Sequence, residues 1–229
     1  MKIYGMEKFS LVDYEGKVAC TLWTAKCNFR CPFCHNASLV EGTLPDVIPE
    51  EDIFGYLNKR RGILDGVCVT GGEPTLNADL REFLRKIKSY GYQVKLDTNG
   101  TRPDMLREIL EDGTVDYVAM DIKNSPEKYY LTAGVEVDMD VIKRSIELVK
   151  KFPSYEFRTT LVYELHERED IVGIGNLVGK AERFYLQKFE DNGGCILSGL
   201  SEVEIDVARE YAEILSKITS GEVKLRSYA

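Results

Sequence analysis

No run of apolar residues in this chain approaches the roughly 18 that a membrane-spanning helix needs. The first residues also lack the apolar stretch of a secretory signal. Positive charge is scarce, because 30 lysines and arginines face 38 aspartates and glutamates and the formal net charge is -8. Bulk electrostatics therefore disfavour binding to nucleic acid or to an anionic membrane. We expect a cytoplasmic protein that binds neither nucleic acid nor membrane.

The chain also lacks internal repeats, low-complexity tracts and evident linkers, so we expect one domain over residues 1–229. Short β-branched runs alternate with longer runs of helical periodicity, which is the pattern of parallel strands joined by helices. Strands are predicted at 2–12, 18–24, 66–70, 92–96, 115–120, 156–162, 183–189 and 222–227. Helices are predicted at 49–60, 78–90, 103–112, 138–151, 168–180 and 202–218. We expect an α/β fold of six β/α units, ending in a helix and strand over 202–228.

Polar motifs stand on or at the ends of the predicted parallel strands. In chain order they are a cysteine loop, Gly71-Gly72-Glu73, Asp97-Thr98-Asn99, Asp121 with Lys123, Arg158, and Gln187 with Lys188. In a barrel-like array of parallel strands, active sites are built at the C-terminal rim. Any one motif would be an ordinary strand-ending turn. Several endings rich in charge and glycine predict one shared site.

Cysteines are few but clustered. The six in the chain are Cys20, Cys27, Cys31, Cys34, Cys68 and Cys195. Disulfides are a poor default for a cytosolic protein of this size. Three cysteines fall within residues 27–34 with the spacing C-x3-C-x2-C, which points to a metal or a cluster. Iron–sulfur clusters usually take four cysteines, so three would leave one iron free for a small-molecule ligand.

Structural zinc and buried reduced thiols compete with a cluster as the role of the cysteine loop. Zinc could use His35 as a fourth ligand. However, Cys34 and His35 are adjacent, no second C-x2-C exists, and the only other histidine is His166. Buried reduced thiols would suit Cys20 and Cys68, which lie in predicted strands, but not a loop of three. The spacing favours an iron–sulfur cluster.

With Phe33 just before its last cysteine, this loop after the first strand resembles that of the radical S-adenosylmethionine (radical SAM) superfamily. The resemblance covers about residues 17–190 and implies a partial (β/α)6, TIM-like barrel with helices outside. It implies a [4Fe–4S] cluster held by Cys27, Cys31 and Cys34, whose fourth iron is chelated by S-adenosylmethionine (SAM). In that superfamily, one electron from the cluster cleaves SAM to methionine and a 5′-deoxyadenosyl radical.

The segment Gly71-Gly72-Glu73-Pro74 looks like the GGE motif of the superfamily, which contacts the amino group of the methionine moiety. Glycine suits this position because its backbone can approach a ligand closely. Taken alone, the segment would be weak evidence. The resemblance makes Gly71, Gly72 and Glu73 candidate cofactor-binding residues, together with the aromatic Phe33.

The segments Asp97-Thr98-Asn99-Gly100 and Met120-Asp121-Ile122-Lys123 resemble those of glycyl-radical enzyme activases, best known in pyruvate formate-lyase activating enzyme. There, two aspartates and a threonine help to bind a monovalent cation beside the cofactor carboxylate. The resemblance assigns this role, for Na⁺ or K⁺, to Asp97, Thr98 and Asp121. Oxygen ligands suit such a hard cation. Taken alone, each aspartate would more often cap a turn.

Lys123 and Arg158 match cationic residues that lie near the cofactor in the family. Either can pair with the methionine carboxylate, Arg158 in a bidentate way, although rim salt bridges are the ordinary alternative. Asn99 and Gln187 are further candidates for cofactor binding, Gln187 only through its position on the sixth strand. His35 matches the Cys-His ending of activases, or else starts a helix.

Residues 10–14 (SLVDY) and 20–23 (CTLW) resemble the activating proteins of anaerobic ribonucleoside-triphosphate reductase. The resemblance implies that hydrogen is abstracted from a glycine Cα of a large partner enzyme, with flavodoxin or ferredoxin as electron donor. Residues 13–17 replace the usual Gly-Pro-Gly segment, which leaves the partner open. No cysteine pairs follow Cys34, so no inserted ferredoxin-like domain is expected.

Two alternatives to an activase stay open. A small-molecule radical SAM enzyme such as 7-carboxy-7-deazaguanine synthase is similar in length and in its GGEP motif. That family usually has an aspartate and a hydroxyl residue after the third cysteine to bind magnesium, whereas this chain has His35 and Asn36. The alternative of another class is a zinc-stabilised binding module without catalysis.

Overall fold

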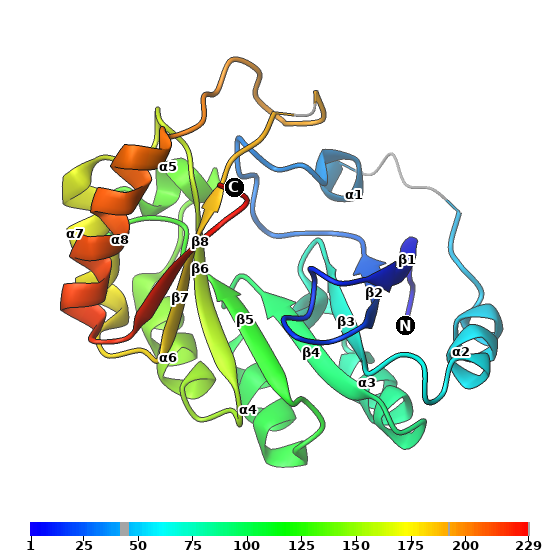
Figure 1. The fold of residues 1–229 in the computed structure, drawn as a ribbon. Helices are drawn as coiled ribbons and strands as arrows, with labels where there is room; N and C mark the ends of the chain where they lie inside the picture. The colour runs from blue at the N-terminus through cyan, green and yellow to red at the C-terminus, as the bar shows by residue number, and fades with distance from the viewer. Residues whose placement is uncertain (42–45, 192, 229) are drawn as a thin grey trace.

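The protein forms one curved sheet with helices on its outer side (Figure 1). The computed structural model describes residues 1–41, 46–191 and 193–228. The strands are β1 (Gly5–Ser10), β2 (Ala19–Thr24), β3 (Gly66–Gly71), β4 (Gln93–Thr98), β5 (Tyr117–Asp121), β6 (Tyr155–Leu161), β7 (Arg183–Lys188) and β8 (Glu222–Arg226). The helices are α1 (Ala37–Glu41), α2 (Glu50–Lys59), α3 (Leu80–Ser89), α4 (Pro103–Asp112), α5 (Tyr129–Ala133), α6 (Met139–Val149), α7 (Arg168–Val178) and α8 (Ile205–Thr219), with a 3₁₀ turn at Pro74–Leu76.

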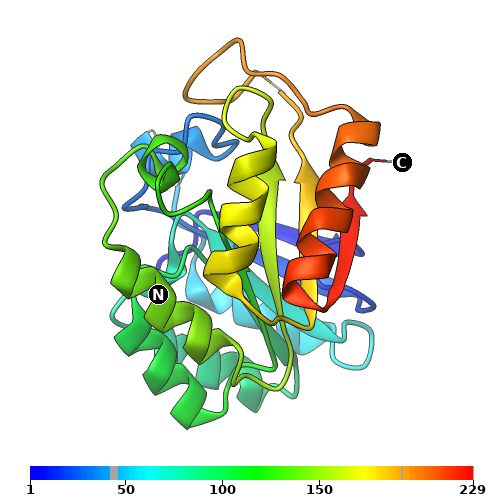
Figure 2. The same cartoon turned by 90° about the vertical axis from the view of Figure 1, so that its left-hand side faces the viewer.

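The eight strands lie in the sheet in chain order, from β1 at one edge to β8 at the other. Strand β1 runs antiparallel to β2, and every later neighbouring pair is parallel. Figure 2 shows α7 and α8 side by side over β6, β7 and β8. This arrangement confirms the predicted α/β class and the partial barrel with helices outside. None of the described helices has the length and apolarity needed to cross a membrane.

Alternation along each strand separates a helix-facing core from an inner polar face. On β5, Val118 and Met120 belong to the main hydrophobic core, whereas Tyr117 and Ala119 belong to a separate small cluster on the inner face. The next residue of the inward series is Asp121, at the C-terminal end of the strand. Parallel pairing places Asp121 directly beside Arg158 of β6. The fold thus places charged groups along one end of the inner face.

The β1–β2 connection reaches onto the inner face. The side chain of Lys95 donates a hydrogen bond to the backbone carbonyl of Asp13, and the ring of Tyr14 packs 5.6 Å from that of Tyr117. Glu15 accepts a hydrogen bond from Tyr185 across the barrel. These contacts belong to the 13–17 segment that differs from the usual Gly-Pro-Gly.

Short elements were missed by the sequence prediction. Helices α1 and α5 have five residues each, which is too few for apolar periodicity to register. Helix α5 begins shortly after β5 and packs on the cysteine loop, since Arg30 donates its backbone N–H to Ala133 O at 2.8 Å. The missed helix therefore borders the candidate site.

Candidate active site

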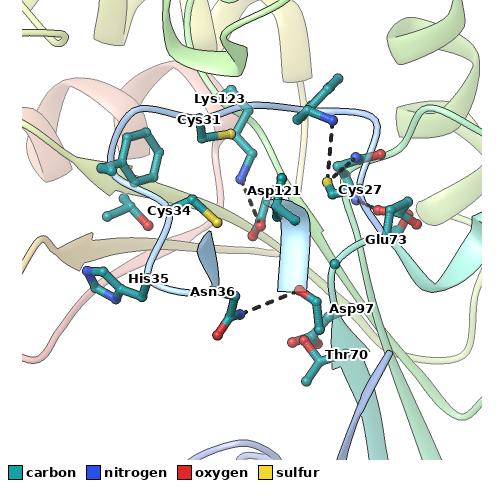
Figure 3. A pocket seen from close by; sticks show the side chains of 18 of the residues that line it. Cys27, Cys31, Cys34, His35, Asn36, Thr70, Glu73, Asp97, Asp121 and Lys123 are labelled. Carbon is teal, nitrogen blue, oxygen red and sulfur yellow. Dashed lines mark hydrogen bonds and ion pairs between the residues drawn. The ribbon is translucent and has the colours of Figure 1, made fainter. Parts of the chain in front are cut away.

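The three clustered cysteines lie on the loop that follows β2, and they line one cavity of about 230 Å³. A backbone hydrogen bond of 3.0 Å from Cys34 N to Cys31 O closes a turn between two of them. Figure 3 shows all three side chains around the same space as Asp121 and Lys123. None forms a disulfide. Three free thiols on one loop, facing one space, are a donor set that fits an iron–sulfur cluster with one corner open.

The cavity lies at the C-terminal ends of β2 to β6, as predicted. It collects Cys27, Cys31, Phe33, Cys34, His35, Gly71, Gly72, Glu73, Asp97, Thr98, Asn99, Asp121, Lys123 and Arg158. Gln187 is the exception among the predicted residues: it pairs with Thr160 on the neighbouring strand and is not among the described residues that line the cavity. The lining also includes Phe29, Asn36, Val40, Thr70 and Thr160, which sequence reasoning had not assigned to the site.

The neighbouring backbone requires the two glycines at the C-terminal end of β3. A Cβ on Gly71, whose φ is +120°, would lie 2.3 Å from the carbonyl oxygen of Thr24. A Cβ on Gly72 would lie 2.1 Å from the carbonyl oxygen of Lys26. Such contacts cannot form without moving the backbone. In the structure the two glycines let the ends of β2 and β3 meet. The expectation that they also allow approach of a ligand stays a prediction.

Glu73 joins the ends of two strands. It is 1% exposed, and its carboxylate accepts hydrogen bonds from Thr98 Oγ1 at 2.8 Å, Asn99 N at 2.6 Å and Thr75 N at 3.1 Å. Burial raises the pKa of Glu73, and these hydrogen bonds oppose that shift. The side chain holds the Asp97-Thr98-Asn99 turn at the cavity wall. Contact with a cofactor amino group stays a prediction.

Asp97 and Asp121 converge on one guanidinium. Arg158 Nε lies 2.8 Å from Asp121 Oδ1, and Arg158 Nη1 lies 3.2 Å from Asp97 Oδ2. Lys123 Nζ lies 3.1 Å from the other oxygen of Asp121. Burial acts to raise the pKa of Asp121, but Arg158 and Lys123 outweigh it and hold the pKa at about 2. Asp121 is therefore charged at neutral pH.

Asp97 keeps one carboxylate oxygen without a hydrogen-bond donor. Its Oδ1 atom is buried and has no hydrogen-bond partner among the described residues, although Lys95 Nζ forms an ion pair with it at 3.3 Å. Burial acts to raise the pKa of Asp97, and Arg158 and Lys95 lower it. A buried carboxylate oxygen with spare accepting capacity fits a bound cation.

Two histidines take different places around the site. The exposed ring of His35 stacks on Phe189, with ring centroids 5.7 Å apart. His166 is buried; its Nδ1 accepts the N–H of Val162 at 3.1 Å, so its Nε2–H donates to the Lys123 carbonyl at 2.9 Å. Burial lowers the pKa of His166 and keeps it neutral. His166 thus fixes the backbone that carries Lys123, a role that no local sequence signal indicated.

The amino-acid sequence of this chain is similar to those of known proteins. The radical SAM superfamily profile matches residues 21–172, more than half of the chain. A protein of Methanocaldococcus jannaschii that is named as a glycyl-radical enzyme activating enzyme is 34% identical over 194 residues, covering 82% of this chain and 80% of that protein. A protein of Thermococcus kodakarensis that is named as a GTP 3′,8-cyclase is 30% identical over 192 residues, covering 83% of this chain and 57% of that protein.

A solved structure shares the fold. SuiB of Streptococcus suis, in its crystal structure bound to SAM, aligns with a TM-score of 0.66 and 18% identity, over 89% of this chain and 49% of SuiB. The superfamily implies a [4Fe–4S] cluster and SAM as cofactors. A non-catalytic zinc module, one of the alternatives from the sequence, is therefore excluded. The matched profile and the relative at 34% identity establish that this chain is an enzyme of the radical SAM superfamily.

Proposed function

We propose that this enzyme is an activase that installs a glycyl radical on a partner enzyme. The observation that carries the proposal is the 34% identity to a glycyl-radical enzyme activating enzyme, which extends over 80% of that relative's length. The resemblance in residues 10–23 favours anaerobic ribonucleoside-triphosphate reductase as the partner. The hydrogen atom would pass from a glycine Cα of the partner to the 5′ carbon of the deoxyadenosyl radical, leaving 5′-deoxyadenosine and a glycyl radical.

In this proposal Cys27, Cys31 and Cys34 ligate the [4Fe–4S] cluster and leave its fourth iron for SAM. When both are bound, the cluster supplies the electron that splits SAM into methionine and the 5′-deoxyadenosyl radical. A flavodoxin or a ferredoxin would deliver that electron. Burial raises the pKa of Cys31 to about 11, so cluster ligation must displace a proton from this thiol.

Charged side chains that line the cavity would orient the methionine moiety of SAM. Lys123 and Arg158 line the cavity, and each has donors beyond those given to the two aspartates. They would bind the carboxylate of SAM, while Glu73 and the backbone of Gly71 and Gly72 would contact its amino group. The ring of Phe33 and the amide of Asn99 complete this set of cofactor contacts.

A monovalent cation would sit with Asp97, Thr98 and Asp121. The Oδ1 atom of Asp97 supports this assignment, because it is a buried anionic oxygen that accepts no hydrogen bond from the described residues and lies beside the residues that would hold the SAM carboxylate. Na⁺ or K⁺ would then lower the repulsion between this oxygen and the SAM carboxylate. The cation would help to bind SAM without taking part in bond cleavage.

A small-molecule radical reaction is the second candidate. It is favoured by the identity of 30% to a GTP 3′,8-cyclase, although the match covers only 57% of that protein. The rest of the cyclase has no counterpart in this match. The third option, 7-carboxy-7-deazaguanine synthase, is supported only by its similar length and its GGEP motif. This chain has His35 and Asn36 where that family usually has an aspartate and a hydroxyl residue.

The deciding experiment uses the anaerobically reconstituted protein with dithionite and SAM. It is incubated with candidate glycyl-radical enzymes, and electron paramagnetic resonance (EPR) reads the glycyl radical. An activase gives the radical doublet on one candidate, with 5′-deoxyadenosine formed in step. A parallel incubation with GTP tests the second candidate. Turnover of GTP without a radical on any partner would reject the activase proposal.

A further inference from the structure

Glu156 is a buried carboxylate inside the barrel that the proposed function does not use. It is 1% exposed and lies on β6, two residues before Arg158. Because side chains alternate along a strand, Glu156 and Arg158 point to the same inner face, while Phe157 between them belongs to the main core. Glu156 is therefore two residues further from the mouth of the barrel than Arg158. A buried carboxylate needs partners for its charge and for its oxygens.

An arginine from the last strand is the main partner of Glu156. Arg226 Nη1 lies 3.2 Å from Glu156 Oε1, and Arg226 Nη2 lies 3.2 Å from Glu156 Oε2, so the guanidinium joins both carboxylate oxygens. The hydroxyl of Tyr117 donates a further hydrogen bond to Glu156 Oε2 at 2.7 Å. The Cζ atom of Arg226 lies 3.9 Å from the centroid of the Tyr185 ring. Arg226 is therefore held by a carboxylate and by an aromatic ring.

The contact between Arg226 and Glu156 connects β8, the red edge strand of Figure 1, with β6 across the intervening β7. The superfamily profile matches residues 21–172 and ends before β7 and β8 begin. Arg226 thus lies outside the part of the chain that the profile matches. It is also not among the described residues that line the cavity.

Arg158 is the second cation near Glu156, and it has carboxylates on two sides. Its Nη1 atom lies 4.0 Å from Glu156 Oε1 but 3.2 Å from Asp97 Oδ2. Its Nε atom lies 2.8 Å from Asp121 Oδ1. Among the described residues, Arg158 and Arg226 are the two cations that form ion pairs with Glu156. Arg158 therefore hydrogen-bonds to the aspartates at the cavity while Arg226 pairs closely with Glu156.

Loss of Arg226 would change this balance. Glu156 would keep the hydrogen bond from Tyr117, and Arg158 would be the remaining cation beside its buried charge. A buried charge that loses its partner is strongly destabilising, so the guanidinium of Arg158 would turn toward Glu156. The donor nearest to Glu156 is Nη1, the same atom that holds Asp97. Turning it would therefore take this donor away from the cavity.

We propose that Arg226 is a positioning residue for SAM binding, because it neutralises Glu156 and so keeps Arg158 directed at the cavity. Arg226 acts through these two side chains and not by contact with the cofactor. The inference rests on the proposed function, in which Arg158 binds the carboxylate of SAM. It gives the last strand of the sheet a role in cofactor binding.

The first test is a crystal structure of the cluster-free Arg226→Met protein, compared with the parent in the same crystal form. Methionine keeps an unbranched side chain against Tyr185 and removes the charge and the donors. Arg158 Nη1 should lie within hydrogen-bond distance of Glu156 Oε1 and should have left Asp97. An Arg158 side chain that keeps its hydrogen bonds to both aspartates would overturn the inference.

The second test measures SAM binding to the cluster-loaded proteins by equilibrium dialysis. The dissociation constant of Arg226→Met should rise about threefold or more, as expected for coupling between interacting residues. The rate of 5′-deoxyadenosine formation at saturating SAM should stay at the parent value, since bound SAM returns Arg158 to the cavity and only KM rises. Arg209→Met, which removes an exposed arginine paired with Asp206 on α8, is the control and should bind SAM as the parent does. Parent affinity in Arg226→Met, at equal iron content, would contradict the proposal.

A double variant separates positioning from a general weakening of the barrel. Combining Glu156→Gln with Arg226→Met removes the carboxylate that would draw Arg158 away, so the SAM dissociation constant should return to within about twofold of the parent. A double variant that binds SAM no better than Arg226→Met would show that Arg226 only supports the barrel, and the inference would be wrong. Parent affinity in Arg158→Lys would instead refute the role of Arg158 on which the inference rests.

Discussion

Arg158 Nε lies 2.8 Å from Asp121 Oδ1, and the pairing of β5 with β6 sets these two residues side by side. The same guanidinium reaches Asp97, which comes from a different strand. Three strands thus share one ion-pair network at the cavity wall. The planar guanidinium joins the two carboxylates in a fixed geometry, which a lysine ammonium cannot reproduce.

Replacing Arg158 with lysine should weaken SAM binding. The charge is kept, but the forked donors that join the carboxylates and face the cavity are lost. Since a hydrogen bond to a charged group contributes about 1.5–3 kcal/mol, we expect the dissociation constant to rise about tenfold or more. Equilibrium dialysis of the cluster-loaded protein measures it. Arg168→Lys, which alters an exposed pair with Glu210, should keep the parent value. Parent affinity in Arg158→Lys would remove Arg158 from the cofactor site.

Replacing Cys31 with alanine should abolish cluster-dependent cleavage of SAM. The variant keeps its fold, since only one sulfur of the cavity wall is removed. Iron content and 5′-deoxyadenosine formation are the measurements. Cys195→Ala is the control, because Cys195 is also a free cysteine but is not among the residues described as lining the cavity. Formation of 5′-deoxyadenosine by Cys31→Ala at the parent rate would show that these thiols are not the ligands.

The succession of strands along the chain and the position of the polar motifs at the strand ends could be predicted from the sequence. Alternating β-branched and amphipathic runs predicted the parallel strands, and polar motifs such as 97–99 lie at the ends of those strands. The cysteine spacing within residues 27–34 is a pattern of neighbouring residues, so it could be recognised without a structure. The same holds for the resemblance to the superfamily.

The contacts between distant segments could not be predicted. Gly72 needs to be glycine because of Lys26, and His166 supports Lys123 from 43 positions away. The expectation for Gln187 used its strand position alone, which does not say how deep in the barrel a side chain lies.

Exchanging Na⁺ and K⁺ for tetramethylammonium, at constant ionic strength, should weaken SAM binding severalfold. The large organic cation cannot reach the buried Oδ1 of Asp97. Asp97→Asn should bind SAM weakly in every salt, since the anionic ligand is gone, whereas Asp104→Asn, at an exposed carboxylate, should behave as the parent does. A SAM dissociation constant that is the same in all three salts would reject the cation site.

Acid should destabilise the cluster-free protein partly through Asp121. Its pKa of about 2 is below its ordinary value of 3.8, so the folded state binds fewer protons than the unfolded state. The stability from this group is full above about pH 4 and is lost as the pH falls through about 2. Urea unfolding at several pH values should show a steeper loss in the parent than in Asp121→Asn. Equal slopes would show that the ion pairs of Asp121 add no pH-dependent stability.

Two glycine-to-alanine substitutions should have opposite effects on stability. At Gly72 the added Cβ would meet Lys26 O at 2.1 Å, so the ends of β2 and β3 must separate, and we expect a loss of about 1–3 kcal/mol in the free energy of unfolding. Gly55 lies within α2 with nothing within 4 Å of its added Cβ. Alanine there should stabilise by about 0.5–1 kcal/mol because it favours the helix.

Urea unfolding of the cluster-free proteins measures both changes in stability. The SAM affinity of the cluster-loaded proteins then shows whether position 72 needs glycine for the contact with Lys26 or for the approach of a ligand. If Gly72→Ala keeps the parent's unfolding free energy but binds SAM weakly, the glycine serves the ligand and not the chain. If it unfolds more easily, the contact with Lys26 is the constraint, because a Cβ that clashes with backbone destabilises the fold whether or not a cofactor is bound.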